Sequence, residues 1–361
     1  MKAKHGILYL LLAIFSSSCI REEAPNAEAD ILSCRLPGVV MTTSPIITNN
    51  SINIFVGPGT DISSLAPEFT LTPGATIDPP SGTARDFHSP QQYTVTAADG
   101  FWKKKYTVSV IDTELATIYN FEDTLGGQKY YIFVEREGEK VVMEWASGNA
   151  GYAMTGVPKT ADDYPTFQFA NGKTGKCLSL VTRSTGFFGS IMGMPIAAGN
   201  LFIGSFDVGN AMSNPLKATK FGLPFRHIPT YLAGYYKYKA GDQFTEGCKP
   251  VSGKRDICDI YAIMYETSES VPTLDGTNAF TSPNLVSIAR IDDAKETDEW
   301  TYFKLPFHML SGKYIDKEKL TAGKYNVAIV FTSSLEGDHF NGAIGSTLLI
   351  DEVELIYRSE D

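Results

Sequence analysis

Polar and apolar residues alternate over the last strand-like run of the chain, residues 346–357. The apolar positions keep a two-residue period on both sides of one break, at Leu348, Ile350, Val353, Leu355 and Tyr357. Such alternation predicts a β-strand with one buried face. The break falls at Asp351 and Glu352. A carboxylate inside a buried face needs a partner, because an unpaired buried charge is costly.

Short alternating runs of the same kind fill residues 31–112, and turn-forming residues separate them. The clearest runs cover residues 51–56, 68–72, 92–97 and 106–110. Asp99-Gly100 marks a tight turn before the last of these runs. This spacing predicts a small Ig-like β-sandwich.

Residues 113–361 are predicted to form a larger β domain, because no stretch keeps a helical period for long. Glycine, aromatic and β-branched residues are frequent instead, as in β-jelly-rolls. Residues 111–115 are the predicted linker, and residues 184–230, with repeated Pro and Gly, are a predicted insertion. The predicted fold class is therefore all-β, with an N-terminal Ig-like sandwich followed by a larger β-jelly-roll.

The N-terminal residues 1–18 have the pattern of a signal peptide. Two lysines precede an apolar run at residues 7–15, which is too short to cross a bilayer. Residues 16–18 and Cys19 resemble a lipoprotein processing site, which predicts an acylated Cys19, a lipid anchor in the outer membrane and exposure at the cell surface. Plain secretion with removal of Cys19 is the alternative. Residues 19–30 contain Glu, Ala, Pro and Asn and are the predicted tether.

Charge and cysteine content limit the classes of partner, disulfide and metal site that are expected. The formal net charge is −10 and the chain shows no basic stripe, so a nucleic-acid partner is not expected. Cys248 and Cys258 flank a polar connection, and in an oxidising compartment they are the predicted disulfide. Two reduced thiols are the alternative, and Cys34 and Cys177 receive no predicted partner. The chain has no Cys-x-x-Cys and no paired histidines, so zinc is not expected.

Five segments together resemble a known family. They cover residues 194–204, 220–225, 234–241, 258–266 and 331–347. In this order they resemble the putative carbohydrate metabolism domain family of bacterial surface lipoproteins. Residues 74–82 and 93–100 are similar to bacterial Ig-like modules that act as spacers. The resemblance implies a jelly roll similar to carbohydrate-binding modules, and a role in glycan handling.

Three acids near the closing strand are candidate metal ligands. Glu122 and Asp123 follow the apolar segment 118–121, and Asp351 interrupts the last strand. Jelly-roll binding modules often hold a calcium ion between their first and last strands, through oxygen ligands of this kind. The resemblance therefore implies a structural Ca²⁺ at these acids. Exposed strand-end acids, or carboxylates that cap turns, are the alternative.

Three aromatic residues are candidate sugar contacts. Trp145, Trp300 and Tyr236 could each stack on a pyranose ring, because the C–H bonds of a sugar suit an aromatic face. Packing of each ring in the core of the sandwich is the alternative.

The loop at residues 333–342 is a second candidate contact. It carries Asp338, His339 and Asn341 on a turn bounded by glycine. Loops held by a rigid scaffold are where binding residues collect. The alternative is a solvated turn in which Asp and Asn bond the local backbone.

The sequence favours glycan binding over catalysis. A glycosidase needs two facing carboxylates, about 5–5.5 Å apart for retention or about 6.5–9.5 Å for inversion. Glu144, Glu266, Glu336 and Asp338 are available, but no spacing singles out a pair. We therefore expect a surface lipoprotein that binds a polysaccharide or oligosaccharide for neighbouring enzymes and glycan-import proteins. A glycoside hydrolase on the same jelly roll and a cell-adhesion protein are the alternatives.

Overall fold

The computed structural model describes residues 27–358, apart from residues 40, 43, 48, 58, 113 and 269. The predicted signal peptide and Cys19 lie outside the described residues. Strands dominate the described part, in which no helix is longer than α3 (Gly186–Ile191). None of the helices described is long and apolar enough to cross a membrane. The predicted all-β fold is confirmed.

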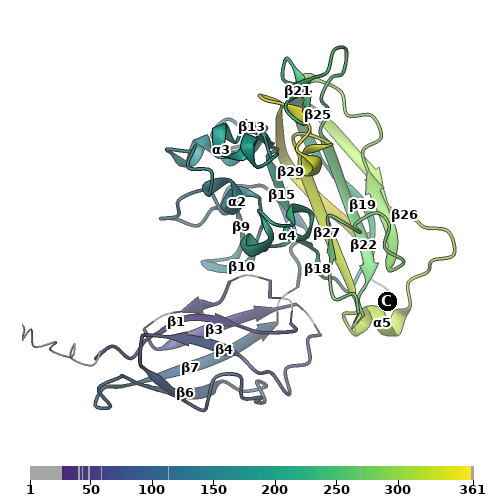
Figure 1. Cartoon of the computed structure of the whole chain (residues 1–361). Helices are drawn as coiled ribbons and strands as arrows, with labels where there is room; N and C mark the ends of the chain where they lie inside the picture. The colour runs from purple at the N-terminus through teal and green to yellow at the C-terminus, as the bar shows by residue number, and fades with distance from the viewer. Residues whose placement is uncertain are drawn as a thin grey trace, which may run out of the picture.

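Two sheets form the N-terminal domain, in the lower part of Figure 1. The larger sheet has the order β2 (Ile46–Ile47), β3 (Ser51–Val56), β7 (Lys103–Asp112), β6 (Gln91–Thr96) and β5 (Thr76–Asp78). The smaller sheet pairs β1 (Ile31–Arg35) with β4 (Glu68–Leu71). The predicted alternating runs fall on β3, β4, β6 and β7. Their inward side chains, among them Ile54, Val95 and Val108, form one hydrophobic core.

Two larger sheets form the C-terminal sandwich, at the right of Figure 1. The first has the order β11 (Thr166–Phe169), β12 (Cys177–Val181), β29 (Thr347–Arg358), β19 (Ile228–Lys239) and β25 (Thr297–Pro306), and β8 (Ile118–Tyr119) pairs with β29. The second has the order β15 (Asn200–Phe202), β27 (Tyr325–Thr332), β22 (Asp259–Glu266), β24 (Leu285–Arg290) and β26 (His308–Met309), and β18 (Leu223–Pro224) pairs with β27.

The second sheet is buried on both faces. Its inner face packs Ile260 and Ile329 into the core between the two sheets, together with Ile350 of β29. Its outer face carries Tyr261 and Val330, which belong to a separate apolar cluster. Because both faces are covered, β22 and β27 are nearly continuous apolar runs and do not alternate.

Short elements cover the outer face of the second sheet and lie to the left of it in Figure 1. They include α2 (Asn149–Ala153), β13 (Arg183–Ser184), α3, β14 (Ile196–Ala197), β16 (Gly204–Phe206), η2 (Val208–Asn210), α4 (Pro215–Ala218), β17 (Thr219–Phe221) and β23 (Leu274–Asp275). The strands β9 (Val134–Glu137) and β10 (Lys140–Glu144) pair with each other, and Met143 of β10 packs in the core between the two larger sheets. The predicted insertion at residues 184–230 supplies many of them, but β15 and β18 within it belong to the sandwich itself.

The remaining elements lie in loops of the larger domain. They are η1 (Ala161–Asp163), β20 (Phe244–Glu246), β21 (Lys249–Pro250), α5 (Lys317–Thr321), η3 (Gly337–His339) and β28 (Gly342–Ala343). The strand β28 pairs with β20, which pairs in turn with β21.

The break in the last predicted strand is a β-bulge in β29. Glu352 has a φ of +47°, and the pairing of β29 with β19 shifts between the Ala233 and Tyr235 positions. A bulge inserts one extra residue on one strand, which explains how the apolar period resumes at Val353 on the same face.

Close contacts join the two domains. The Glu144 backbone N–H donates to the Thr42 carbonyl oxygen at 3.1 Å, and the Ser44 hydroxyl donates to the Glu144 carboxylate at 3.2 Å. A Cβ added at Gly57 would lie 2.3 Å from Cγ of Pro224, so this approach requires glycine.

Candidate functional site

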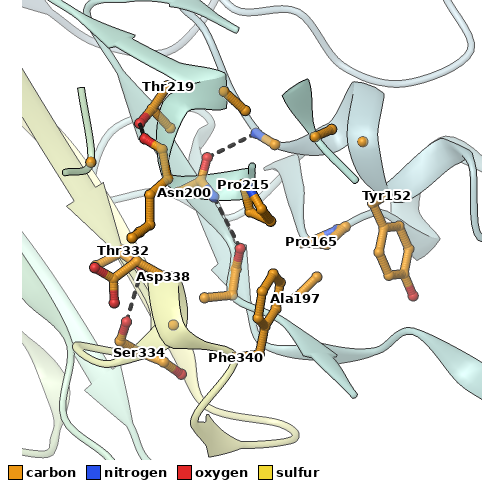
Figure 2. A pocket seen from close by; sticks show the side chains of 18 of the residues that line it. Tyr152, Pro165, Ala197, Asn200, Pro215, Thr219, Thr332, Ser334, Asp338 and Phe340 are labelled. Carbon is orange, nitrogen blue, oxygen red and sulfur yellow. Dashed lines mark hydrogen bonds between the residues drawn. The ribbon is translucent and has the colours of Figure 1, made fainter. Parts of the chain in front are cut away.

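A cavity of about 540 Å³ lies between the outer face of the second sheet and the short elements that cover it. Residues of α2, α3, α4, β22, β27 and η3 line it. Figure 2 shows Tyr152, Asn200, Asp338 and Phe340 around this space. A cavity of this size can hold a drug-sized molecule or a short oligosaccharide.

Eight Phe and Tyr side chains and four methionines give the cavity a largely apolar wall. The aromatic residues that line the cavity are Tyr152, Phe188, Phe202, Phe206, Phe221, Tyr261, Phe280 and Phe340. The methionines that line it are Met154, Met192, Met194 and Met212. Phe188 remains 48% exposed, so part of this apolar wall is open to solvent.

An ion pair between the buried Asp259 and the partly exposed Arg290 forms part of the polar lining. Arg290, the last residue of β24, donates from Nε to Oδ1 of Asp259 at 3.1 Å and from Nη2 to Oδ2 at 2.7 Å. The guanidinium carbon of Arg290 also lies 4.5 Å from the ring centroid of Phe280. Burial raises the pKa of Asp259, although the bonds from Arg290 oppose the rise.

Asp338 and His339 of η3 lie near this ion pair and also line the cavity. Nδ1 of His339 is 2.7 Å from Oδ1 of Asp338, and both side chains are at least half exposed. The negative charge of Asp338 contributes to the raised pKa of Asp259 and of Tyr261, after the larger effect of burial on each group. The cavity therefore combines an apolar wall with one charged and hydrogen-bonding region.

A buried carboxylate anchors the loop that carries η3. Oδ2 of Asp256 accepts hydrogen bonds from the Ser334 hydroxyl at 2.6 Å, the Ser346 hydroxyl at 2.7 Å and the Ala343 backbone N–H at 2.8 Å. Burial raises the pKa of Asp256, and these bonds oppose the rise. Asp256 thus fixes both ends of the loop and the position of Asp338 between them.

Asn341 holds this loop and does not line the cavity. Its Oδ1 accepts from the Gly247 backbone N–H at 3.3 Å, and its Nδ2 donates to the Glu336 carboxylate at 3.4 Å. The Glu336 carboxylate is also 2.7 Å from Nζ of Lys254. Of the predicted polar contacts, the structure brings Asp338 and His339 to the cavity and leaves Asn341 outside its lining.

The three predicted aromatic contacts lie away from the cavity. Trp145 is 3% exposed and packs in the sandwich core, where its Nε1 donates to Glu135 at 2.9 Å. Tyr236 is also buried, and its hydroxyl accepts from the Lys295 backbone N–H at 3.3 Å. The prediction that Trp145 and Tyr236 stack on a sugar is wrong, because no face of either ring is free. Trp300 is partly exposed on β25, with Lys237 Nζ 5.3 Å from its ring centroid.

The predicted calcium ligands Glu122 and Asp351 accept hydrogen bonds from backbone N–H groups. Within the described residues, no group of three or more His, Cys, Asp or Glu side chains is placed to hold an ion. Oδ2 of Asp351 instead accepts from the backbone N–H groups of Lys173 at 2.7 Å and Thr174 at 3.2 Å. Oε1 of Glu122 accepts from the Lys176 backbone N–H at 2.9 Å, while the exposed Asp123 lies 3.8 Å from Arg136.

Glu122 and Asp351 therefore meet at one loop, residues 172–176, and bind its backbone N–H groups. The alternative interpretation, in which these carboxylates cap turns, describes both residues. Backbone N–H groups satisfy a buried carboxylate in the same way as a cation does, which explains how Asp351 is tolerated in the core.

The predicted disulfide is absent, because Cys248 and Cys258 are both free thiols. Cys248 is exposed in the turn between β20 and β21, whereas Cys258 is buried just before β22. Cys34 and Cys177 are also free and buried, and burial raises the pKa of each thiol to about 12.

Most residues of the cavity wall were not predicted from the sequence. Phe188 lies in the Gly-Phe-Phe-Gly run of the predicted insertion, and this apolar pair between glycines was the available signal. Asp259 and Arg290 belong to the neighbouring strands β22 and β24, which are far apart in the sequence, so no local sequence pattern indicates their ion pair.

Comparisons with known proteins agree with a glycan-related chain. The family model described as "Putative carbohydrate metabolism domain" matches residues 120–356. The model described as "SGBP, N-terminal", for surface glycan-binding proteins, matches residues 31–110. A search among curated proteins finds no match.

One solved structure is similar over about two-thirds of this chain. It is described as a putative glycoside hydrolase from Bacteroides vulgatus, is 48% identical, and has a TM-score of 0.64. The match covers 68% of this chain and 99% of that chain. A putative secreted protein from Bacteroides fragilis is 18% identical over 24% of this chain and 98% of its own, but its TM-score of 0.20 adds nothing on the fold.

Proposed function

Because this chain belongs to the putative carbohydrate metabolism domain family, we propose that it binds an oligosaccharide, or a segment of a polysaccharide, in the cavity of its larger domain. The N-terminal match to surface glycan-binding proteins indicates a surface or secreted protein. We propose further that Cys19 carries the lipid anchor and that the protein captures glycan for neighbouring enzymes and importers.

The chemistry of the cavity carries this proposal. Aromatic faces such as those of Tyr152 and Phe340 suit the C–H bonds of a sugar ring, and Asp338 and His339 offer polar atoms for its hydroxyl groups. Sugar-binding sites need both kinds of group, because a pyranose has apolar faces and a polar rim.

The state of the carboxylates favours binding over hydrolysis. Both oxygens of Asp259 accept bonds from Arg290, Glu336 is paired with Lys254, and Asp338 is paired with His339. A general acid and its partner carboxylate must instead face a bond of the substrate. Each acid that lines the cavity thus already has a basic partner.

Hydrolysis of the bound glycan is the second candidate function. The pKa of the buried Asp259 is raised and Asp338 acts on it, so two carboxyl groups with different environments share the cavity. Such a difference is the pattern of an acid and its partner carboxylate in glycosidases. The relative of 48% identity is described as a putative glycoside hydrolase, which supports this candidate.

A substitution at Phe188 tests the cavity as the binding site. Binding to a panel of polysaccharides is measured by affinity gel electrophoresis and calorimetry for the wild type and Phe188→Ala. We expect Phe188→Ala to weaken binding by about tenfold, the effect of losing one aromatic stacking contact. Phe187→Ala is the matched control, because Phe187 is the neighbouring residue of α3, is 83% exposed and does not line the cavity.

Two outcomes would contradict this proposal. Equal binding by the wild type and Phe188→Ala would place the glycan outside the cavity. Release of reducing sugar by the wild type that is lost in Asp338→Asn would instead favour the hydrolase.

A further inference from the structure

The turn between β6 and β7 presents two aromatic side chains to solvent. Phe101 is 88% exposed and Trp102 is 65% exposed. The backbone of the turn is ordered, because Oδ1 of Asp99 accepts from the backbone N–H of Phe101 at 2.8 Å and of Trp102 at 3.3 Å. Gly100 supplies the left-handed turn position with a φ of +75°. An ordered turn thus holds two large apolar groups outward, at a cost that calls for a partner.

Basic residues follow the two aromatic residues directly. Lys103 and Lys105 are exposed on β7, and alternate residues of a strand point to the same side. Among the described residues, no hydrogen bond or ion pair to the side chain of either lysine is found, although their backbones pair with β6. Lys104 between them is paired with Asp30. In a chain whose net charge is −10, this turn therefore has an uncommon combination of aromatic and positive groups.

The turn lies at the end of the domain where the described chain begins. The Thr72 hydroxyl donates to the Glu28 carbonyl oxygen at 2.8 Å, and a Cβ at Gly74 would lie 2.7 Å from the Cβ of Ala98, which is part of the turn. Lys104, which follows the turn, forms an ion pair with Asp30, close to the first described residues. The opposite end of the domain faces the larger domain. There Gly57, which follows β3, lies against Pro224 of the larger domain.

We infer that Phe101 and Trp102 insert into the surface of a lipid bilayer, with Lys103 and Lys105 against its anionic headgroups. Tryptophan and lysine next to apolar groups are typical of membrane interfaces. The chain between Cys19 and Ala27 can span at most about 30 Å, so an acyl group on Cys19 keeps the bilayer near this turn. The turn would then set how the larger domain stands on the membrane, a role beyond glycan binding in the cavity.

A sugar is a less suitable occupant for this turn. Sugar sites are concave and surround a ring with polar partners, whereas these two side chains project from the tip of a hairpin. Asp99, the acid of the turn, is already bonded to the backbone.

Vesicle binding tests this inference on the chain from residue 20 onward, which contains every described residue and no acyl group. Vesicles of phosphatidylcholine and phosphatidylglycerol in equal amounts are sedimented with the protein, and the partition coefficient is measured. We expect the double variant Phe101→Ser, Trp102→Ser to lower it at least about tenfold. Phe187→Ser is the control for an equally exposed ring elsewhere, and we expect no change.

Brominated acyl chains supply an independent readout. They should quench the fluorescence of the wild type on vesicles, and the quenched fraction should disappear in Trp102→Phe. The double variant Lys103→Glu, Lys105→Glu should weaken binding to anionic vesicles more than binding to pure phosphatidylcholine.

Three results would overturn the inference. The wild type could fail to bind vesicles, or Phe187→Ser could reduce binding as much as the substitutions in the turn. Alternatively, the turn variant could bind vesicles normally and lose retention on a polysaccharide, which would make the turn a glycan contact.

Discussion

At the scale of single residues, burial decides the role of each aromatic and acidic side chain. Trp145 and Phe188 both stand near small and polar residues in the sequence, yet Trp145 packs 4.9 Å from the ring of Tyr119 and Phe188 lines the cavity. The residues that bury Trp145 come from distant strands. A local pattern therefore cannot show which aromatic residue is free to bind a ligand.

The stability of the protein is expected to depend on the ionisation of Glu135. Burial raises the pKa of Glu135 to about 7, although the hydrogen bond from Trp145 lowers it. Between pH 4.5 and about 7 the folded state keeps a proton that the unfolded state has lost. The free energy of unfolding should therefore fall over this interval as the pH rises, by roughly 2–3 kcal/mol.

Urea unfolding of the wild type and Glu135→Gln at several pH values measures this effect. Glutamine keeps an acceptor for Trp145 and cannot ionise, so the wild type should lose stability relative to the variant across the interval. Parallel curves would show that Glu135 titrates normally.

At the scale of elements, the strand β29 shows what the sequence can and cannot predict. Its alternation and its break at Asp351 and Glu352 predicted the strand and its buried face. The partner of Asp351 was not predictable, because the N–H groups of residues 173 and 174 belong to a loop far away in the chain. Similarly, β22 and β27 do not alternate, because a second layer covers their outer face.

Asp351→Asn tests how the acid holds the loop at residues 172–176. Asparagine replaces one acceptor oxygen with an NH₂ group that cannot accept from Lys173 and Thr174. We expect a loss of about 1–3 kcal/mol in the free energy of unfolding, as for a buried group left unsatisfied. Asp123→Asn is the control, because Asp123 is 58% exposed and its ion pair with Arg136 is long at 3.8 Å. The free energy of unfolding of this variant should stay within about 0.5 kcal/mol of the wild type.

A chelator distinguishes this loop contact from an ion site. If EDTA lowers the melting temperature of the wild type and has no effect on Asp351→Asn, a cation does bind there and the loop contact is not the whole account.

At the scale of the whole molecule, each of the two domains has a hydrophobic core of its own. The core of the N-terminal domain contains Ile54, and the core of the sandwich contains Ile260. The contacts between the domains are partly polar, such as that of Glu144 with Thr42. The turns and alternation of residues 31–112 predicted the strands of the smaller domain. The docking of the two domains could not be predicted, because it depends on surface contacts that give no periodic pattern in the sequence.

Calorimetry of Ile54→Ala tests whether the two cores unfold separately. Removing a buried isoleucine costs about 2–5 kcal/mol. We expect one transition to move to lower temperature while the other, and ligand binding in the cavity, stay unchanged. A single transition that shifts as a whole would show that the contacts between the domains couple the two cores.

The four methionines of the cavity wall have a consequence for the range of ligands. Met154, Met192, Met194 and Met212 have long, unbranched side chains that change conformation easily. Methionine side chains can adapt to the shape of a ligand, whereas backbone pairing holds the strands of the second sheet beneath them. If the proposed glycan binds in this cavity, we expect it to accept several related glycans of different branching, with selectivity set by the charged groups of Asp338 and Arg290.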